Sequence, residues 1–369
     1  ASDGDRGSAV TTGVDYALDN GLNFQVAAGV GSGATSQIAT RYAVGEGHEL
    51  YGSYAVDPDR TELARNLLTL GQRRAFGNGL DLFTESQFGK GDQQAGTGHV
   101  FGLGFEGNDD WRFSASVQFG EYDRLEQVFD RRALSLGAYR NLGDFKLSSR
   151  IEYREDDGPE VHSRQYVTSN SFTRVLDENR RWLGQLNLAW TDDKLNGGRD
   201  ARFVELDVGY AYRPASNDNL NVIARYGFLF DLPTEGQATL RPDERSHLVS
   251  VEGIYDLENR WELAAKVAIR QGERRVFRDE GTWDDFGLRM VSTRARYALT
   301  RKWDALVEYR WLSDVGGKED RHGALLALYR HVNDHMKVGV GFNFTDFSDE
   351  LRIEDYESSG WFVDIVGMY

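Results

Sequence analysis

The sequence predicts an all-β fold, a closed antiparallel transmembrane β-barrel of about 20 to 22 strands. Three observations lead to it: apolar and polar residues alternate with a period of two, tight turns recur along the chain, and aromatic residues gather at the strand ends. Of 369 residues, 41 are glycine and 45 are aromatic, whereas only five are proline. All five prolines lie in expected loops or turns, which suits a sheet that needs its N–H donors.

The alternation is clearest over residues 297–311, YALTRKWDALVEYRW. After the polar break at residues 300–302, Trp303, Ala305 and Val307 are apolar, and the series continues through Tyr309 and Trp311. Charged residues, such as Asp304 and Glu308, stand between them. A period of two is typical of a β-strand with one apolar and one polar face.

Ten sites carry the glycine, asparagine and aspartate residues that tight hairpin turns require. They lie at residues 19–21, 45–47, 77–79, 107–110, 143–144, 177–179, 215–219, 258–259, 300–302 and 333–334. The segments that join one hairpin to the next are generally longer and more polar. Ten hairpins and a C-terminal strand predict twenty-one strands.

Aromatic residues flank these turns, most often a tyrosine before and a tryptophan or phenylalanine after. Indole and phenol rings prefer the interface between hydrocarbon and water, so repeated rings at one strand end indicate a membrane rather than a soluble core. A second set, including Trp190, Phe228 and Trp311, follows about ten residues later. The predicted interface belt beside the turns consists of Trp111, Phe145, Trp182, Trp261, Trp303, Tyr297, Tyr255 and Tyr212.

The alternative is a soluble sandwich with its apolar residues in a core. The strands are each one-sided, as in Leu263, Ala265, Val267 and Ile269, and together they offer too few apolar residues to fill a core between two sheets. We therefore expect the apolar face to meet lipid and the polar face to surround water.

Several other classes of protein are disfavoured. There is no cysteine, and no apolar run approaches the roughly 20 residues of a membrane-spanning helix. The seven histidines are scattered and form no metal-ligand spacing, so neither a metal site nor an enzyme is expected. Residues 102–107 match G-x-G-x-x-G but end a strand, so no dinucleotide cofactor is expected. The net charge of −16 argues against nucleic acid as a partner.

The polar face is expected to carry thirteen basic and eleven acidic residues, which favours cross-strand pairing over a strong ion filter. The predicted lumen charges include Arg150, Glu152, Arg225, Lys266, Arg294, Arg296, Glu308 and Arg310. The acidic excess is expected in the longer connections, residues 121–130 among them. These are expected to form an outer rim that is simply solvated, is bridged by divalent cations to lipopolysaccharide, or repels anionic solutes. Residues 273–285, which hold acidic and basic residues together, are the predicted loop over the mouth.

The chain ends in a strand with alternating apolar residues and a final aromatic, made by Trp361, Val363, Ile365, Gly367 and Tyr369. This resembles the C-terminal targeting strand of bacterial outer-membrane β-barrels, although Gly367 is smaller than usual. The resemblance implies location in the bacterial outer membrane, contact with its lipids and recognition by the barrel-assembly machinery. More loosely, residues 321–325 and 338–347 resemble the barrel domain of large modular proteobacterial surface proteins.

We expect residues 1–8 to be an N-terminal tail and residues 9–369 to be the barrel. Single-chain bacterial barrels generally have even strand numbers, so twenty-one strands imply either an unpartnered first segment, a first segment outside the barrel, or one parallel closing pair. Two functions follow. One is a wide, weakly selective aqueous pore; the alternative is an outer-membrane anchor for an exposed surface domain, with its lumen closed by loops.

Overall fold

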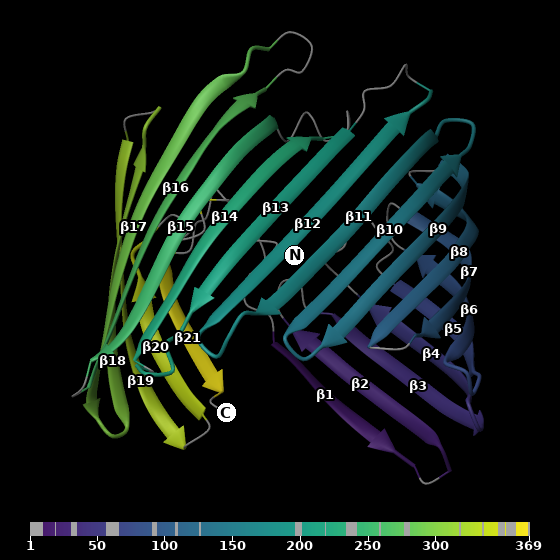
Figure 1. Cartoon of the computed structure of the whole chain (residues 1–369), viewed down its shortest axis with the longest axis horizontal. Coiled ribbons are helices and arrows are strands. Elements are labelled where there is room, and N and C mark those ends of the chain that lie inside the picture. Colours follow the sequence, from purple (N-terminus) through teal and green to yellow (C-terminus); the bar gives the residue numbers. More distant parts are fainter. Residues whose placement is uncertain are drawn as a thin grey trace. The chain divides into compact units, whose positions relative to one another are not determined.

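The computed structural model describes residues 10–18, 20–30, 35–56, 66–90, 94–107, 110–124, 127–195, 201–217, 219–233, 242–257, 260–276, 281–316, 319–333, 336–345, 351 and 359–367. These residues form β-strands and connections, without helix (Figure 1). No helix among them is long and apolar enough to cross a membrane. The predicted tail, residues 1–8, lies outside the described residues.

Twenty-one strands of one sheet are described. The first ten are β1 (Val10–Ala17), β2 (Leu22–Val30), β3 (Ser36–Gly45), β4 (His48–Val56), β5 (Asn66–Ala75), β6 (Leu80–Lys90), β7 (Gln94–Glu106), β8 (Trp111–Arg124), β9 (Gln127–Leu142) and β10 (Phe145–Asp157). The others are β11 (His162–Val175), β12 (Arg180–Asp193), β13 (Ala201–Tyr212), β14 (Leu220–Leu232), β15 (Asp243–Leu257), β16 (Trp261–Arg275), β17 (Asp284–Thr300), β18 (Trp303–Asp314), β19 (Glu319–Asn333), β20 (Met336–Asn343) and β21 (Gly360–Gly367).

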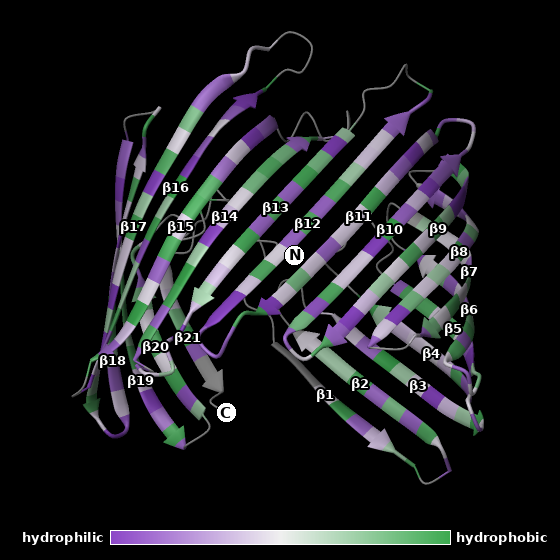
Figure 2. Cartoon of the chain, in the orientation of Figure 1, coloured by the Kyte–Doolittle hydropathy of each residue, from purple (hydrophilic) through white to green (hydrophobic). Residues whose placement is uncertain are grey.

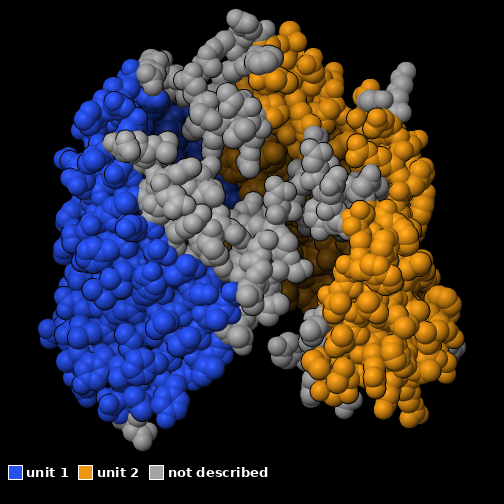
Figure 3. All heavy atoms as spheres, turned by 180° about the vertical axis from the view of Figure 1, so that it is seen from behind, with its two compact units in different colours: residues 1–170, 187–202 blue, residues 171–186, 203–369 orange. Residues whose placement is uncertain are grey.

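The chain divides into two compact units, coloured separately in Figure 3. Unit 1 comprises residues 1–170 and 187–202, and unit 2 comprises residues 171–186 and 203–369. Within unit 1, consecutive strands from β1 to β10 pair antiparallel, and within unit 2 the same holds from β14 to β21. The predicted all-β class, antiparallel order and strand number are confirmed. Closure of residues 9–369 into one barrel stays a prediction.

All ten predicted tight turns fall at connections between an odd-numbered strand and the next even-numbered strand. The backbone explains the residue types. Gly47 and Gly79 have φ angles of +69° and +81°, and a Cβ atom on Gly79 would stand 2.6 Å from the carbonyl oxygen of Glu106. Only glycine adopts this conformation and tolerates this approach without cost.

At the opposite ends, several strands are longer than the sequence suggested. Residues 121–130 were expected to form a polar loop, yet β8 runs to Arg124 and β9 begins at Gln127. The two ends of the predicted mouth loop, residues 273–285, belong to strands: β16 runs to Arg275 and β17 begins at Asp284, with Glu273 in register with Asp285 and Arg274 with Asp284. Of these two pairs, Arg274 and Asp284 bring opposite charges together, which stabilises the extension. The predicted loops were therefore too long here.

The two faces of each strand differ in chemistry and in exposure, and hydrophobic and hydrophilic residues alternate along the strands in Figure 2. In β16, Trp261, Leu263 and Val267 are exposed, whereas Glu262 and Lys266 between them are half-buried. We call the side with the exposed apolar residues the apolar face, and the other side the polar face. A water-soluble sheet buries the opposite set of residues.

Candidate functional site

The apolar face carries the predicted aromatic belt. All eight predicted residues lie at strand ends beside tight turns, with Trp182, Trp261, Trp303 and Tyr255 exposed and the other four half-buried. Trp261 and Tyr297 are register partners whose ring centroids lie 4.6 Å apart. In unit 1, Trp111 and Phe113 stack at 5.5 Å. That these rings meet a membrane interface stays a prediction.

Two of the tyrosines that precede tight turns belong to the other face. Tyr329 is buried, and its hydroxyl donates a hydrogen bond of 3.3 Å to Asp364. Tyr139 pairs in register with Arg112 on β8 and lines a polar-face recess with it. An aromatic residue before a turn therefore marks the strand end but not the face, because the face depends on whether the residue number is odd or even along its strand.

On the polar face of unit 1, the charges are grouped around shared carboxylates. Glu152 accepts hydrogen bonds from Arg150 at 2.9 Å and from Arg154 at 2.6 Å, both on β10. Farther along β10, Asp156 accepts two hydrogen bonds, of 2.7 and 2.8 Å, from Arg131 on the neighbouring strand β9. Bidentate pairs of this kind fix the position of both side chains.

The polar face of unit 2 repeats the arrangement. Glu262 lies 2.9 Å from Nη1 of Arg296 and 3.7 Å from Nη2 of Arg294. Glu308 pairs with Arg310 on the same strand. All eight predicted lumen charges lie on this face of their units, including Arg225, 3.3 Å from Asp207, and Lys266, opposite Glu252 in register.

An apolar cluster on the polar face of unit 2 was not foreseen. Met290 and Ala268 are buried there together with Leu351, a residue between β20 and β21. The buried Arg270 donates a 2.5 Å hydrogen bond from Nη1 to the carbonyl oxygen of Leu351. Residue 351 therefore packs onto the polar face, a position that no period-two pattern could indicate. The sequence had instead proposed residues 273–285 for such a role.

A second exception, Leu306, interrupts the alternation of β18. It is buried on the polar face with Ala327 and Tyr329. Both exceptions lie in unit 2, where they replace charge with packed apolar surface.

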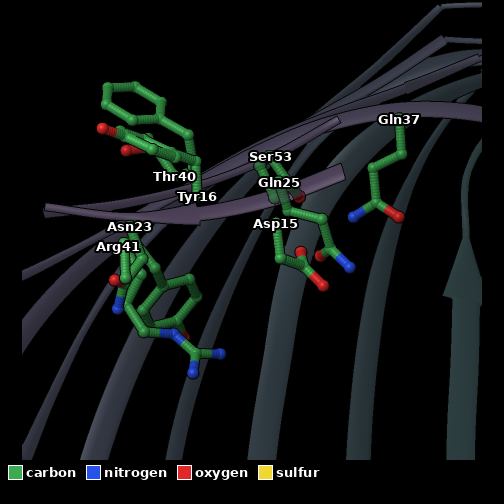
Figure 4. A pocket seen from close by; sticks show the side chains of 13 residues that line it. Asp15, Tyr16, Asn23, Gln25, Gln37, Thr40, Arg41 and Ser53 are labelled. Carbon is green, nitrogen blue, oxygen red and sulfur yellow. The ribbon is translucent and has the colours of Figure 1, made fainter. Parts of the chain in front are cut away.

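A polar recess of about 510 Å³ lies over β1 to β4 in unit 1. In Figure 4 the side chains of Asp15, Gln25 and Gln37 point to the same side of the ribbon, opposite to Tyr16. Asp15 and Gln25 are register partners. The recess supplies hydrogen-bonding groups to the polar face, and the sequence gave no signal for it beyond the alternation itself.

The histidines do not assemble a metal centre among the described residues, where no group of three or more potential ligands is found. His331 lies 2.7 Å from Asp304 on the polar face. His335 is outside the described part of the chain.

The C-terminal strand is present as β21, paired with β20 from Gly360 to Gly367. Trp361 and Val363 are the most exposed large apolar residues described, at 78% and 73%. The side chain of Ile365 and the whole of Tyr369 lie outside the described residues. Their role as an assembly signal stays a prediction.

Comparison with known proteins gives structural neighbours only. No family model matches the chain. No curated protein matches it. Solved structures that it resembles include the copper transporter OprC (14% identity, TM-score 0.45, covering 98% of this chain and 74% of that one). Another is P. aeruginosa FpvA bound to a pyoverdine and iron (11% identity, TM-score 0.49, covering 99% of this chain and 69% of that one). A third is the alcaligin outer-membrane receptor FauA from Bordetella pertussis (12% identity, TM-score 0.41, covering 91% of this chain and 67% of that one).

FauA is named as an outer-membrane receptor, and the likeness of all three structures is one of fold. Because these three TM-scores are below 0.5, the function is derived from the chemistry of the two faces.

Proposed function

We propose that the chain is an integral outer-membrane β-barrel that forms a wide, weakly selective aqueous pore. The observation that carries this proposal is the reversed chemistry of the sheet: large apolar residues are exposed on one face, and charged residues are half-buried on the other. On β18, Val307 and Tyr309 are 48% and 46% exposed, whereas Asp304 and Glu308 are 8% and 9% exposed. Apolar side chains in such numbers need lipid around them.

The width follows from strand number. A closed barrel of about twenty strands is too wide for side chains to fill, so its interior holds water unless a segment occupies it. Paired charges such as Arg131 and Asp156 present little net field to a passing ion. A pore lined in this way discriminates weakly between solutes.

The apolar cluster around Leu351 supports the alternative, an outer-membrane anchor whose lumen is obstructed. Leu351 covers Met290 and Ala268 on the polar face and is fixed there by Arg270. A residue held on this face takes space from an aqueous path. The two functions thus differ in whether the path conducts while Leu351 is in place.

Single-channel recording in planar bilayers distinguishes them. The full chain is compared with Leu351→Ser, which removes the apolar contact with Met290, and with Leu326→Ser, a matched control on the apolar face. We expect the wild type to conduct steadily and Leu351→Ser to conduct more. A silent wild type that opens only in Leu351→Ser would favour the anchor. Silence in both, from protein shown to be inserted, would refute the pore.

Outer-membrane lipids, lipopolysaccharide and the barrel-assembly machinery are the partners that this proposal implies. Deleting residues 361–369, which removes the exposed Trp361 and Val363, is expected to prevent assembly in cells but not refolding into detergent. Equal loss in both settings would mean that β21 is needed for stability rather than for recognition.

A further inference from the structure

Two small residues interrupt a row of large ones on the apolar face of unit 2. Ala295 on β17 and Ala305 on β18 are half-buried, and their register partners include Val307 and Tyr297. They form the floor of a groove of about 850 Å³. Its lining is apolar and includes Leu326, Leu328 and Val340 together with aromatic residues of β16, β17, β20 and β21.

Aromatic rings form both walls of the groove. On one side Trp261 and Tyr297 lie 4.6 Å apart. On the other, Phe342 meets Trp361 nearly edge-on at 5.3 Å and contacts Phe344 at 4.4 Å. Rings in mutual contact keep their positions, so the groove is formed before any ligand enters. Its volume and apolar lining suit a hydrocarbon chain.

A cation stands at the turn end of the groove. Arg330 follows Leu328 by two residues on the same face of β19, is exposed, and lies over the ring of Trp303 at 5.8 Å. No ion pair links it to a carboxylate among the described residues. Arg301 and Lys302 occupy the adjoining turn and are also exposed. This concentration of positive charge is notable in a chain of net charge −16.

We propose that this groove binds one anionic phospholipid, with an acyl chain over Ala295 and Ala305 and the phosphate at Arg330. The inference rests on the proposed membrane function. Guanidinium groups bind phosphate through charge-assisted hydrogen bonds, and a cation at the edge of an apolar surface attracts anionic headgroups. Arg330 lies at the level of the aromatic belt, where headgroups are found.

A second copy of the chain fits the groove less well. In a membrane, a two-fold axis along the bilayer normal brings the same face of both copies together at the same depth. Arg330, Arg301 and Lys302 would then face their own counterparts. Like charges in contact oppose association.

Native mass spectrometry of the full chain in detergent tests the proposal, with phosphatidylglycerol and phosphatidylethanolamine titrated separately. Arg330→Gln removes the phosphate ligand, and Ala305→Phe fills the floor, with Ala295→Phe as a second filling variant. The matched control is Arg140→Gln, because Arg140 also lies over a belt tryptophan, Trp111, at 5.3 Å but belongs to unit 1. Heat-modifiable migration confirms folding of each variant.

We expect wild type and Arg140→Gln to prefer phosphatidylglycerol, Arg330→Gln to lose about fivefold in affinity for it, and Ala305→Phe to weaken both lipids. Equal binding in all variants would overturn the proposal, as would a dimer that Ala305→Phe dissociates without changing lipid binding. Bilayer insertion is measured on the same preparations. Failure to insert would refute the proposed function, whereas normal insertion with unselective lipid binding would refute only the groove.

Discussion

Replacing Val251 with arginine tests directly which medium the apolar face meets. Val251 is 48% exposed on β15, opposite Val267 on β16 and Ala224 on β14. It lies six residues before Leu257, the register partner of Trp261. At a rise of about 3.4 Å per residue and a tilt of about 40°, Val251 stands about 16 Å from the belt, close to the middle of an apolar band about 25 Å tall.

Arginine near the bilayer midplane costs about 2 to 4 kcal/mol, falling to about 0 to 1 kcal/mol at the interface. Leu257→Arg is the matched control, since it places the same residue on the same strand and face at belt level. The free energy of unfolding is measured by guanidinium titration in lipid vesicles, followed by tryptophan emission. We expect Val251→Arg to cost about 1 to 4 kcal/mol more than Leu257→Arg. Equal costs, or a neutral Val251→Arg, would show that this face does not cross a bilayer.

Four further outcomes follow from single contacts. Gly79→Ala is expected to destabilise the protein by about 1 to 2 kcal/mol, because Gly79 has a φ angle of +81° and an added Cβ would lie 2.6 Å from the carbonyl oxygen of Glu106. The control Gly77→Ala, whose added Cβ meets open space, should be nearly neutral. Thermal unfolding measures both. Met290→Ala should cost about 2 to 5 kcal/mol in denaturant titration, since the side chain is fully buried; a smaller loss would mean that Leu351 does not pack there. Glu262→Gln leaves Arg294 and Arg296 without their shared carboxylate, so the reversal potential should shift towards anion permeation. An unchanged reversal potential would place these residues off the ion path. In the turn before β12, hydrogen bonds from the Arg180 side chain and the Asn179 N–H lower the pKa of Asp177. This contact therefore contributes above the pKa of the unfolded chain and is lost as pH falls through the lower folded value; carboxyl NMR titration should show that Arg180→Gln raises the pKa, and no change would refute the contact.

The tight turns and the alternation were predictable because each is local. A turn such as residues 77–79 needs glycine for its own backbone, and the face of Val267 follows from its place in the alternating series with Ala265 and Ile269. The ends of β16 and β17 were not predictable in the same way. Arg274 and Asp284 resemble loop residues singly, and only their opposite positions in register make them part of a ladder.

The groove and the Leu351 cluster depend on contacts between residues far apart in sequence. Ala295 and Ala305 are unremarkable on their own strands; they form one floor because β17 and β18 pair in a register that sets them beside Tyr297 and Val307. Leu351 lies in a polar part of the sequence and gains its significance from Arg270, eighty-one residues earlier. Periodicity assigns a residue to a face, but it does not determine which residues of other strands lie beside it.

The aromatic belt and the charged groups of unit 2 occupy adjacent backbone positions and point to opposite faces. Trp261 precedes Glu262, Arg296 precedes Tyr297, and Trp303 precedes Asp304. Because register pairs Trp261 with Tyr297 and Glu262 with Arg296, the rings and the ions form two adjacent rows across the same strands. If the rings set the depth of the strands in the bilayer, they also set the depth at which Glu262 and its arginines meet the aqueous path. A substitution that moves the rings, such as Trp261→Ala, should therefore alter ion selectivity without touching a charge.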